Sequence, residues 1–226
     1  MKFTPRWFWG MASVVLLCAI AAAETGADSS QVRVLVYRTV PVPGAILERA
    51  RIEALRIFHA AGIQLSWVNC SYEIPNPACR VETTGTVLYL HIVAGTRSSN
   101  DMVYGEAFVA EDGGGNLADL FFDRIKNAER SFGIDPGRLL GTVAAHEIGH
   151  LLLGSHAHWP IGIMTPIWEG DSLRFVGMGA LFFTPNQMIR MRERLRQNDP
   201  ELANVKTGNQ PAHTDSVNYR VPRLEF

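Results

Sequence analysis

Residues 135–166 have the sequence DPGRLLGTVAAHEIGHLLLGSHAHWPIGIMTP and contain four of the seven histidines of the chain. Asp135 is a favourable N-cap, Pro136 fits the first helical position, and Gly154 is a favourable C-terminal stop. The residues between them are apolar on most sides, which predicts a buried helix over residues 136–153. Buried imidazoles need partners, so the histidines indicate a metal site.

The first two histidines of this stretch have the spacing of metal ligands. His146 and His150 are four residues apart, so on a helix their rings stand one above the other. Two imidazoles placed in this way can bind one Zn²⁺. Glu147 points beside the metal, where its carboxylate can accept a proton from a zinc-activated water. The pattern HExxH is typical of metalloproteases and predicts Glu147 as the general base.

A catalytic zinc needs a third protein ligand and an open fourth position. Two candidates follow the helix, and two ways of counting favour different ones. Counted from the helix, the third ligand is His156. Counted from Gly154, which turns the chain out of the helix, it falls near residues 157–158, where His158 is the available side chain. One of the two is expected to bind, with a slight preference for His158 because turn geometry aims the ring.

This stretch resembles the signature of the metzincin clan of zinc metallopeptidases, HExxHxxGxxH followed by a methionine turn. Four residues match in type and spacing, namely His146, Glu147, His150 and His156. Residues 162–166 (GIMTP) resemble the methionine turn, which implies that Met164 packs beneath the histidines without binding the metal. The glycine departs from the signature, because Gly154 stands one place later. The chain is therefore similar to an atypical, bacterial-type member.

Strand and helix patterns alternate along the rest of the chain. Strands are predicted over residues 31–40, 63–68, 86–95, 102–112 and 117–125, and further helices over residues 45–62 and 184–198. The β-α-β beginning implies a parallel pair of strands. We therefore expect an α+β fold with a twisted, mostly parallel sheet of about five strands, a backing helix and the active-site helix. We expect a small irregular C-terminal subdomain with one helix after it. The β-α-β-β-β-α order that precedes this subdomain resembles the metzincin upper subdomain.

The fourth predicted strand contains Gly105, which suits a sheet edge or a surface that another chain approaches. The resemblance implies that a peptide lies extended along residues 105–109 as an added strand. Zinc then polarises the scissile carbonyl, and Glu147 takes a proton from water and passes it to the leaving amine. Trp168 and Phe175 are candidates for the wall of the substrate pocket.

The first 23 residues are typical of a secretory signal. Lys2 and Arg6 precede an apolar run that ends in small residues, and cleavage is predicted after Ala23. A retained membrane anchor is the alternative, but the run is shorter than the ~20 apolar residues of a membrane span. We expect a secreted or periplasmic protein without stable membrane association once the signal is cleaved.

Export also affects how the cysteines are interpreted. Cys70 and Cys79 are the cysteines that remain after cleavage, and an oxidising compartment favours a disulfide between them.

Residues 24–198 are predicted to form one metzincin-like catalytic domain. Residues 199–226 are polar and aperiodic, which predicts a flexible tail.

The charges are balanced, with 21 Lys and Arg against 22 Asp and Glu, which argues against nucleic acid as a partner. The leading hypothesis is an exported endopeptidase with one catalytic Zn²⁺ and a peptide or protein substrate. One alternative is a non-catalytic binding domain whose zinc site is closed by His156 and His158 together. Glu147 argues against it, because a structural site needs no base. A three-histidine zinc hydrolase acting on nucleic acid is a weaker alternative.

Overall fold

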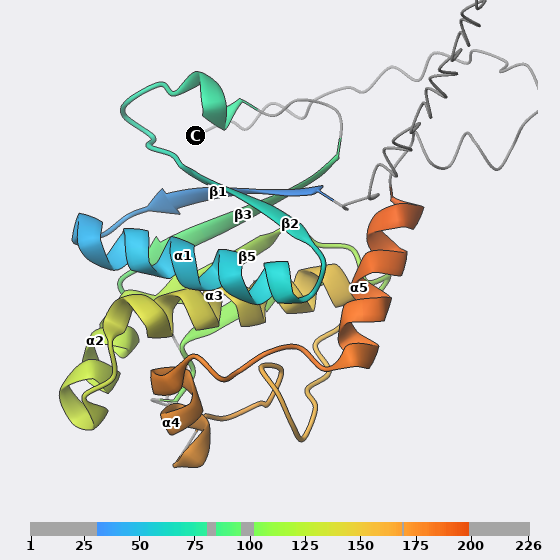
Figure 1. Ribbon diagram of the computed structural model, residues 1–226. Coiled ribbons are helices and arrows are strands. Elements are labelled where there is room, and N and C mark those ends of the chain that lie inside the picture. The colour runs from blue at the N-terminus through green and yellow to red at the C-terminus, as the bar shows by residue number, and fades with distance from the viewer. Residues whose placement is uncertain (1–30, 81–84, 96–101, 169, 199–226) are drawn as a thin grey trace, which may run out of the picture.

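The computed structural model describes residues 31–80, 85–95, 102–168 and 170–198, and a five-stranded sheet lies at its centre (Figure 1). The strands are β1 (Gln31–Arg38), β2 (Gln64–Asn69), β3 (Thr86–Val93), β4 (Gly105–Phe108) and β5 (Leu117–Phe121), in the order β2-β1-β3-β5-β4. Among these described strands, only β4 pairs antiparallel with its neighbour. The fold is therefore α+β with a mostly parallel sheet, as the sequence predicted.

Two helices cover one face of this sheet, α1 (Gly44–Ala60) and α3 (Pro136–Leu153) (Figure 1). Alternate valines of β1 point into the core on that face and are fully buried. In α1 the buried apolar positions recur at helical spacing, so the helix presents a continuous stripe to the sheet and to α3. These are the two helices that the sequence predicted over residues 45–62 and 136–153.

Helix α3 begins and ends where its sequence signals place it. The Asp135 side chain accepts a hydrogen bond from the backbone N–H of Arg138 at 2.7 Å, and Pro136 occupies the first turn. Gly154 ends the helix in the left-handed conformation, with φ of 61°. Most residues of α3 are buried, so the helix runs through the interior and carries its polar side chains with it.

Two predicted strands are shorter than the sequence indicated by four residues or more, whereas two others differ by two residues. The strand predicted to residue 125 ends at Phe121, and helix α2 (Phe122–Phe132) follows at once. Its buried residues are Phe122, Ile125 and Ala128, which share one helical face, so packing overrides the β-propensity of the aromatic run. Strand β4 covers residues 105–108 and not 102–112, because Ala110 and Gly114 close a turn after it.

The described part of the C-terminal region, residues 170–198, contains two helices where one was predicted. Helix α5 (Pro185–Gln197) was expected, and Thr184 forms a capping box with Gln187 at its start. Helix α4 (Asp171–Met178) was missed because it is a short helix whose buried residues are Leu173 and Val176 alone. In Figure 1 helix α4 lies below α3, on the side away from the sheet, and α5 stands beside the right-hand end of α3.

The other face of the sheet carries the loop closed by a disulfide between Cys70 and Cys79, as the sequence predicted (Figure 1). The Tyr72 ring of this loop packs 4.7 Å from the Tyr37 ring of β1, measured between centroids. The predicted signal (residues 1–23) and tail (199–226) lie outside the described residues, so both remain predictions. In the described segments, every helix is too short or too polar for a membrane span.

Candidate metal centre

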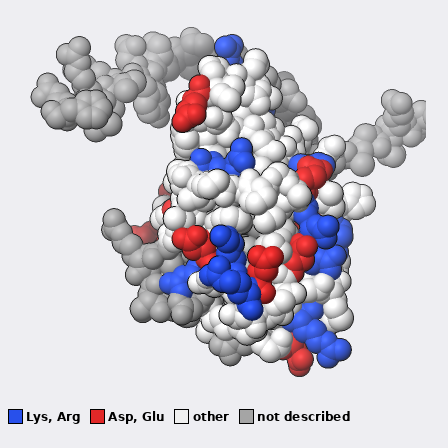
Figure 2. Space-filling view, turned by 90° about the vertical axis from the view of Figure 1, so that its left-hand side faces the viewer, with Lys and Arg blue, Asp and Glu red and all other residues white. Residues whose placement is uncertain are grey.

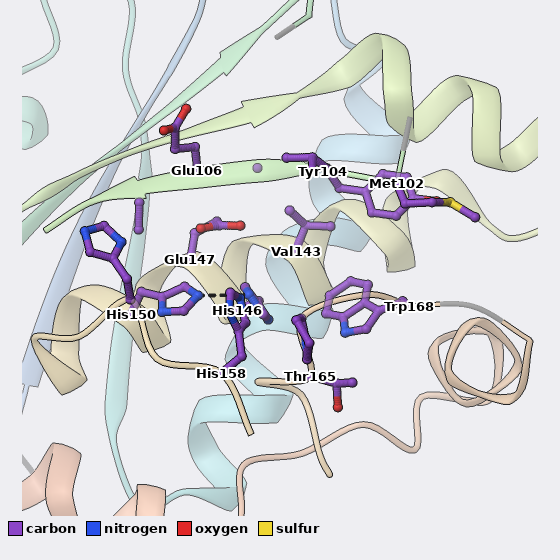
Figure 3. Close-up of a pocket in the computed structure, with 15 residues that line it drawn as sticks. Met102, Tyr104, Glu106, Val143, His146, Glu147, His150, His158, Thr165 and Trp168 are labelled. Carbon is purple, nitrogen blue, oxygen red and sulfur yellow. Dashed lines mark hydrogen bonds between the residues drawn. The ribbon is translucent and has the colours of Figure 1, made fainter. Parts of the chain in front are cut away.

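Helix α3 presents three polar side chains to one end of a cleft, and all are more than nine-tenths buried. They are His146, Glu147 and His150. The Nε2 atoms of the two histidines lie 3.1 Å apart, as Figure 3 shows with a dashed line. This closeness follows from the four-residue spacing on a regular helix.

A third imidazole joins them from the loop that follows the helix. The ligand-type atoms of His146, His150 and His158 all lie within 4.8 Å of one another. The His158 ring centroid is 4.8 Å from that of His150 and 5.4 Å from that of His146. His156 lies outside this group, because its Nε2 is 2.8 Å from the carbonyl oxygen of Val109. Of the four predicted histidines, the structure therefore brings three together.

The position of Gly154 accounts for this arrangement. Its left-handed backbone turns the chain out of α3, and the next N–H, of Ser155, donates to the His150 carbonyl at 3.2 Å. The guanidinium of Arg194 from α5 occupies the space that a Cβ at residue 154 would need. Because α5 holds the turn at this residue, the loop aims His158 at the helix and His156 at the sheet edge.

Two backbone carbonyls fix the orientation of the helical imidazoles. Nδ1 of His146 lies 2.7 Å from the Ile163 carbonyl oxygen, and Nδ1 of His150 lies 2.7 Å from that of Ser155. A carbonyl can only accept, so each Nδ1 carries its hydrogen and donates it. Burial, followed by the neighbouring histidines, lowers the pKa of His146 to about 3, and burial lowers that of His150 to about 4. The rings are therefore neutral near pH 7, with bare Nε2 atoms.

This donor set fits a zinc ion. Two bare nitrogen lone pairs that face each other at 3.1 Å are unfavourable unless a cation lies between them. Zn²⁺ binds imidazole nitrogens at about 2.0–2.1 Å, which puts two ligands of a tetrahedron about 3.3 Å apart. The exposed His158 is the third member of the set. His146, His150 and His158 would hold the ion and leave one position open.

The carboxyl group of Glu147 lies against the backbone of β4. The Ala107 N–H donates a hydrogen bond to it, and a Cβ at Gly105 would lie 2.7 Å from its Oε1. Gly105 is thus approached by a side chain of this same molecule. Burial, followed by the negative charge of Glu106, raises the pKa of Glu147 to about 8. A carboxyl with such a pKa is suited to exchange protons near neutral pH.

Met164 lies fully buried beneath helix α3. A Cβ at Gly149 would lie 2.7 Å from its sulfur, and 2.7 Å from Cε1 of Phe183. Gly149 therefore lets the methionine and the phenylalanine approach the helix between the two histidines. The neighbouring residue Ile163 supplies the carbonyl that orients His146, so this turn supports the ring position.

The histidines and Glu147 open onto a cleft of about 210 Å³ between β4 and the loop after α3 (Figure 3). Tyr104, Val143 and Trp168 line it on one side of the histidines. Trp168 therefore lines this cleft, and its contact with a substrate stays a prediction. Phe175 lies on α4, outside the set of described residues that line the cleft.

Hydrogen bonding to β5 defines the free edge of β4, which is the last strand of the described sheet. The Phe121 N–H donates to the carbonyl of Tyr104 at 2.8 Å, and the register places these residues opposite each other. Because bonded pairs alternate along an antiparallel ladder, every second residue turns its N–H and C=O outward. The outward residues are Gly105, Ala107 and Val109.

The site already uses two of these outward groups. The Ala107 N–H bonds to Glu147, and the Val109 carbonyl accepts from His156. His156 therefore ends the free edge at Val109 and ties it to the loop that carries His158. The sequence left His156 and His158 open as alternatives, and only the fold assigns them different neighbours.

Sequence reasoning did not identify the backbone partners of the site. The carbonyls of Ser155 and Ile163 carry no signal in a side-chain pattern, because any residue offers them. Gly105 did give a signal, as a glycine inside a β-type run. Gly149 was not singled out, although a glycine inside a helix, which costs about 1 kcal/mol relative to Ala, is a signal that could have identified it.

No family model matches the chain, and a search of curated proteins gives no match. Among solved structures, archaemetzincin from Methanopyrus kandleri is similar, with 13% identity, a TM-score of 0.47, and coverage of 75% of this chain and 98% of that chain. A zinc-dependent peptidase from Methanocorpusculum labreanum is similar with 14% identity, a TM-score of 0.48, and coverage of 70% and 99%. At such low identity a likeness does not carry a function from one chain to another.

Proposed function

We propose that this chain is an exported zinc-dependent endopeptidase. One observation carries the proposal: three imidazoles converge on a point in a cleft, and the carboxyl group of Glu147 lies beside them. Three ligands with an open position are typical of catalytic zinc, whereas structural zinc is closed by four. His158 is the third ligand in this proposal, and Met164 is a support and not a ligand.

The free edge of β4 supports a peptide as the substrate. An extended chain can hydrogen-bond as an added strand to the outward N–H and C=O of Gly105 and to the outward C=O of Ala107. Antiparallel pairing is the more stable mode, so the substrate would run opposite to β4. A second hollow continues along Phe108, Val109 and Gly115 beyond His156. Because the cleft extends on both sides of the histidines, it favours cleavage within a chain.

In the proposed reaction, Glu147 carries out the proton transfers. A zinc ion held by the three histidines would polarise the scissile carbonyl and acidify water. The Glu147 carboxylate takes a proton from the attacking water and delivers it to the leaving amine nitrogen. Its burial excludes bulk water, and the Ala107 N–H orients the carboxylate towards the cleft.

Two alternatives are less well supported. A closed site of four histidines requires His156, whose Nε2 is bonded to the Val109 carbonyl. A nucleic-acid substrate requires a basic surface, and the face shown in Figure 2 has acidic and basic side chains intermixed. Export is proposed from the signal-like sequence of residues 1–23, and the Cys70–Cys79 disulfide fits an oxidising compartment.

The test combines zinc analysis with cleavage of peptides blocked at both ends, which exopeptidases cannot cut. We expect the wild type to hold one zinc and to cut such peptides internally. Glu147→Gln should keep its zinc and lose activity by at least about 10²-fold, since a general base contributes 10²–10⁴-fold. Glu129→Gln on α2 removes the same charge far from the cleft and is the control. Undiminished cleavage by Glu147→Gln would contradict the mechanism.

A further inference from the structure

Glu106 lies at the centre of the free edge and lines both hollows of the cleft. Its side chain projects from the side of β4 opposite to Glu147, as Figure 3 shows. The side chain is exposed, and within the described residues it makes no hydrogen bond or ion pair. Glu106 is thus a charged group in the cleft with no partner there.

The neighbouring strands place a second carboxylate directly beside it. Glu106 pairs in register with Asp119 of β5, and Asp119 pairs with His91 of β3. Like charges directly opposite each other in a sheet are unfavourable. Asp119 has the His91 ring, whose Nδ1 lies 3.7 Å from its Oδ1. The free edge of β4 lies on the other side of Glu106. A positively charged partner for Glu106 would therefore have to come from a strand added at that edge.

An added substrate strand would bring one residue especially close to Glu106. The backbone of Glu106 bonds towards β5, so on the free side it occupies a non-hydrogen-bonded position. Residues opposite each other at such positions have Cα atoms about 4.5 Å apart, and their side chains lie on the same face of the sheet. One substrate side chain would therefore stand next to the Glu106 carboxylate.

We propose that Glu106 is a specificity-determining residue, which selects substrates with Lys or Arg at the position that pairs with it. This inference rests on the proposed peptidase function. The backbone of Gly105 and Ala107 fixes the register of the added strand, so the preference falls on one position at a constant distance from the scissile bond. Alternate substrate residues point to the other face and do not meet the carboxylate.

The experiment uses blocked peptides of one uncharged scaffold, in which a single Lys, Gln or Glu is moved along the chain. At one position we expect the wild type to prefer Lys over Glu by about fivefold or more in kcat/KM, the size of a cross-strand charge pair. The preference should shrink as ionic strength rises, because salt screens exposed charges.

Two variants and one control separate charge recognition from a structural effect. Glu106→Gln should lose the preference at that position alone, and Glu106→Lys should invert it in favour of Glu. Glu129→Gln should keep the wild-type pattern. If the wild type cuts the peptides with no charge preference at any position, or if Glu106→Gln keeps the preference, the inference is wrong and the proposed function stands. If the full-length, zinc-loaded protein cuts none of them, the proposed function itself is wrong.

Discussion

Helix α3 and the loop from Gly154 to Trp168 contribute to the same site in different ways. The helix holds His146 and His150 through local geometry, because a regular helix places residues four apart on one face. The loop places His158 through contacts with distant parts of the chain, including the Arg194 guanidinium at Gly154. The same contacts send His156 to the Val109 carbonyl.

This difference teaches that residue spacing is a reliable guide to ligands only while the backbone is regular. Along the helix each residue advances by a fixed angle, so ring positions follow from the sequence. After Gly154, one left-handed residue redirects everything that follows. His156 has the spacing of the metzincin signature, yet it is the ring of His158 that lies beside His146 and His150.

The largest effect, on zinc affinity, should come from replacing each of the two loop histidines by alanine in turn. His158→Ala should lower zinc affinity by more than about 100-fold, beyond the 10–100-fold cost of losing an outer partner. His156→Ala should retain zinc within about 10-fold, because it removes a contact to the sheet edge and not a ligand. Zinc competition with a chromophoric chelator measures both.

If His156→Ala were the poorer zinc binder, His156 would be the third ligand, as counting residues from the helix indicates. Equal large losses would instead favour the closed four-histidine site. Circular dichroism of each variant with and without zinc separates loss of the ligand from loss of the fold.

A smaller effect should follow from filling the contact between the helix and the loop. Gly149→Ala places a methyl group 2.7 Å from both Met164 Sδ and Phe183 Cε1, and overpacking of this kind costs about 1–3 kcal/mol of stability. Gly177→Ala on α4 meets nothing within 4 Å and should stabilise by up to about 1 kcal/mol through helix propensity. Urea unfolding of the two variants makes the comparison. A Gly149→Ala protein as stable as Gly177→Ala would show that Met164 and Phe183 are not packed tightly there.

The last prediction concerns pH and the buried groups of the helix. The pKa values of His146 and His150 are lowered to about 3 and about 4, so their contribution to stability is complete above pH 6.5 and lost on acidification. The pKa of Glu147 is raised to about 8, so its contribution is complete below pH 4.5 and lost as pH rises to 8. Without metal, stability should therefore peak near pH 6.5.

Melting temperatures from pH 3 to 9 with a chelator measure this profile. Glu147→Gln should remove the decline above pH 6.5, since no other group in the helical part of the site titrates there. An unchanged alkaline decline in that variant would contradict the assignment. Saturating zinc should move the optimum to higher pH, because its imidazole ligands must be unprotonated.

The parts of the fold that the sequence predicted are those with long, regular patterns. Helix α3 has 18 residues with a cap at each end, and the strands of the parallel sheet are strongly apolar. Helices α2 and α4 were missed because three and two buried residues, respectively, are too few to establish a period. The length of β4 was overestimated because the turn at Ala110 and Gly114 depends on backbone bonds and not on residue type.

The sequence alone determined the helical pair of histidines, the glutamate between them and the sheet that supports them, because local periodicity encodes these features. The tertiary structure decided which loop histidine faces the pair, which carbonyls orient the rings, and that Glu106 stands unpartnered beside the cleft. Each of these depends on segments far apart in the chain. Their relative positions follow from packing, which no spacing of residues records.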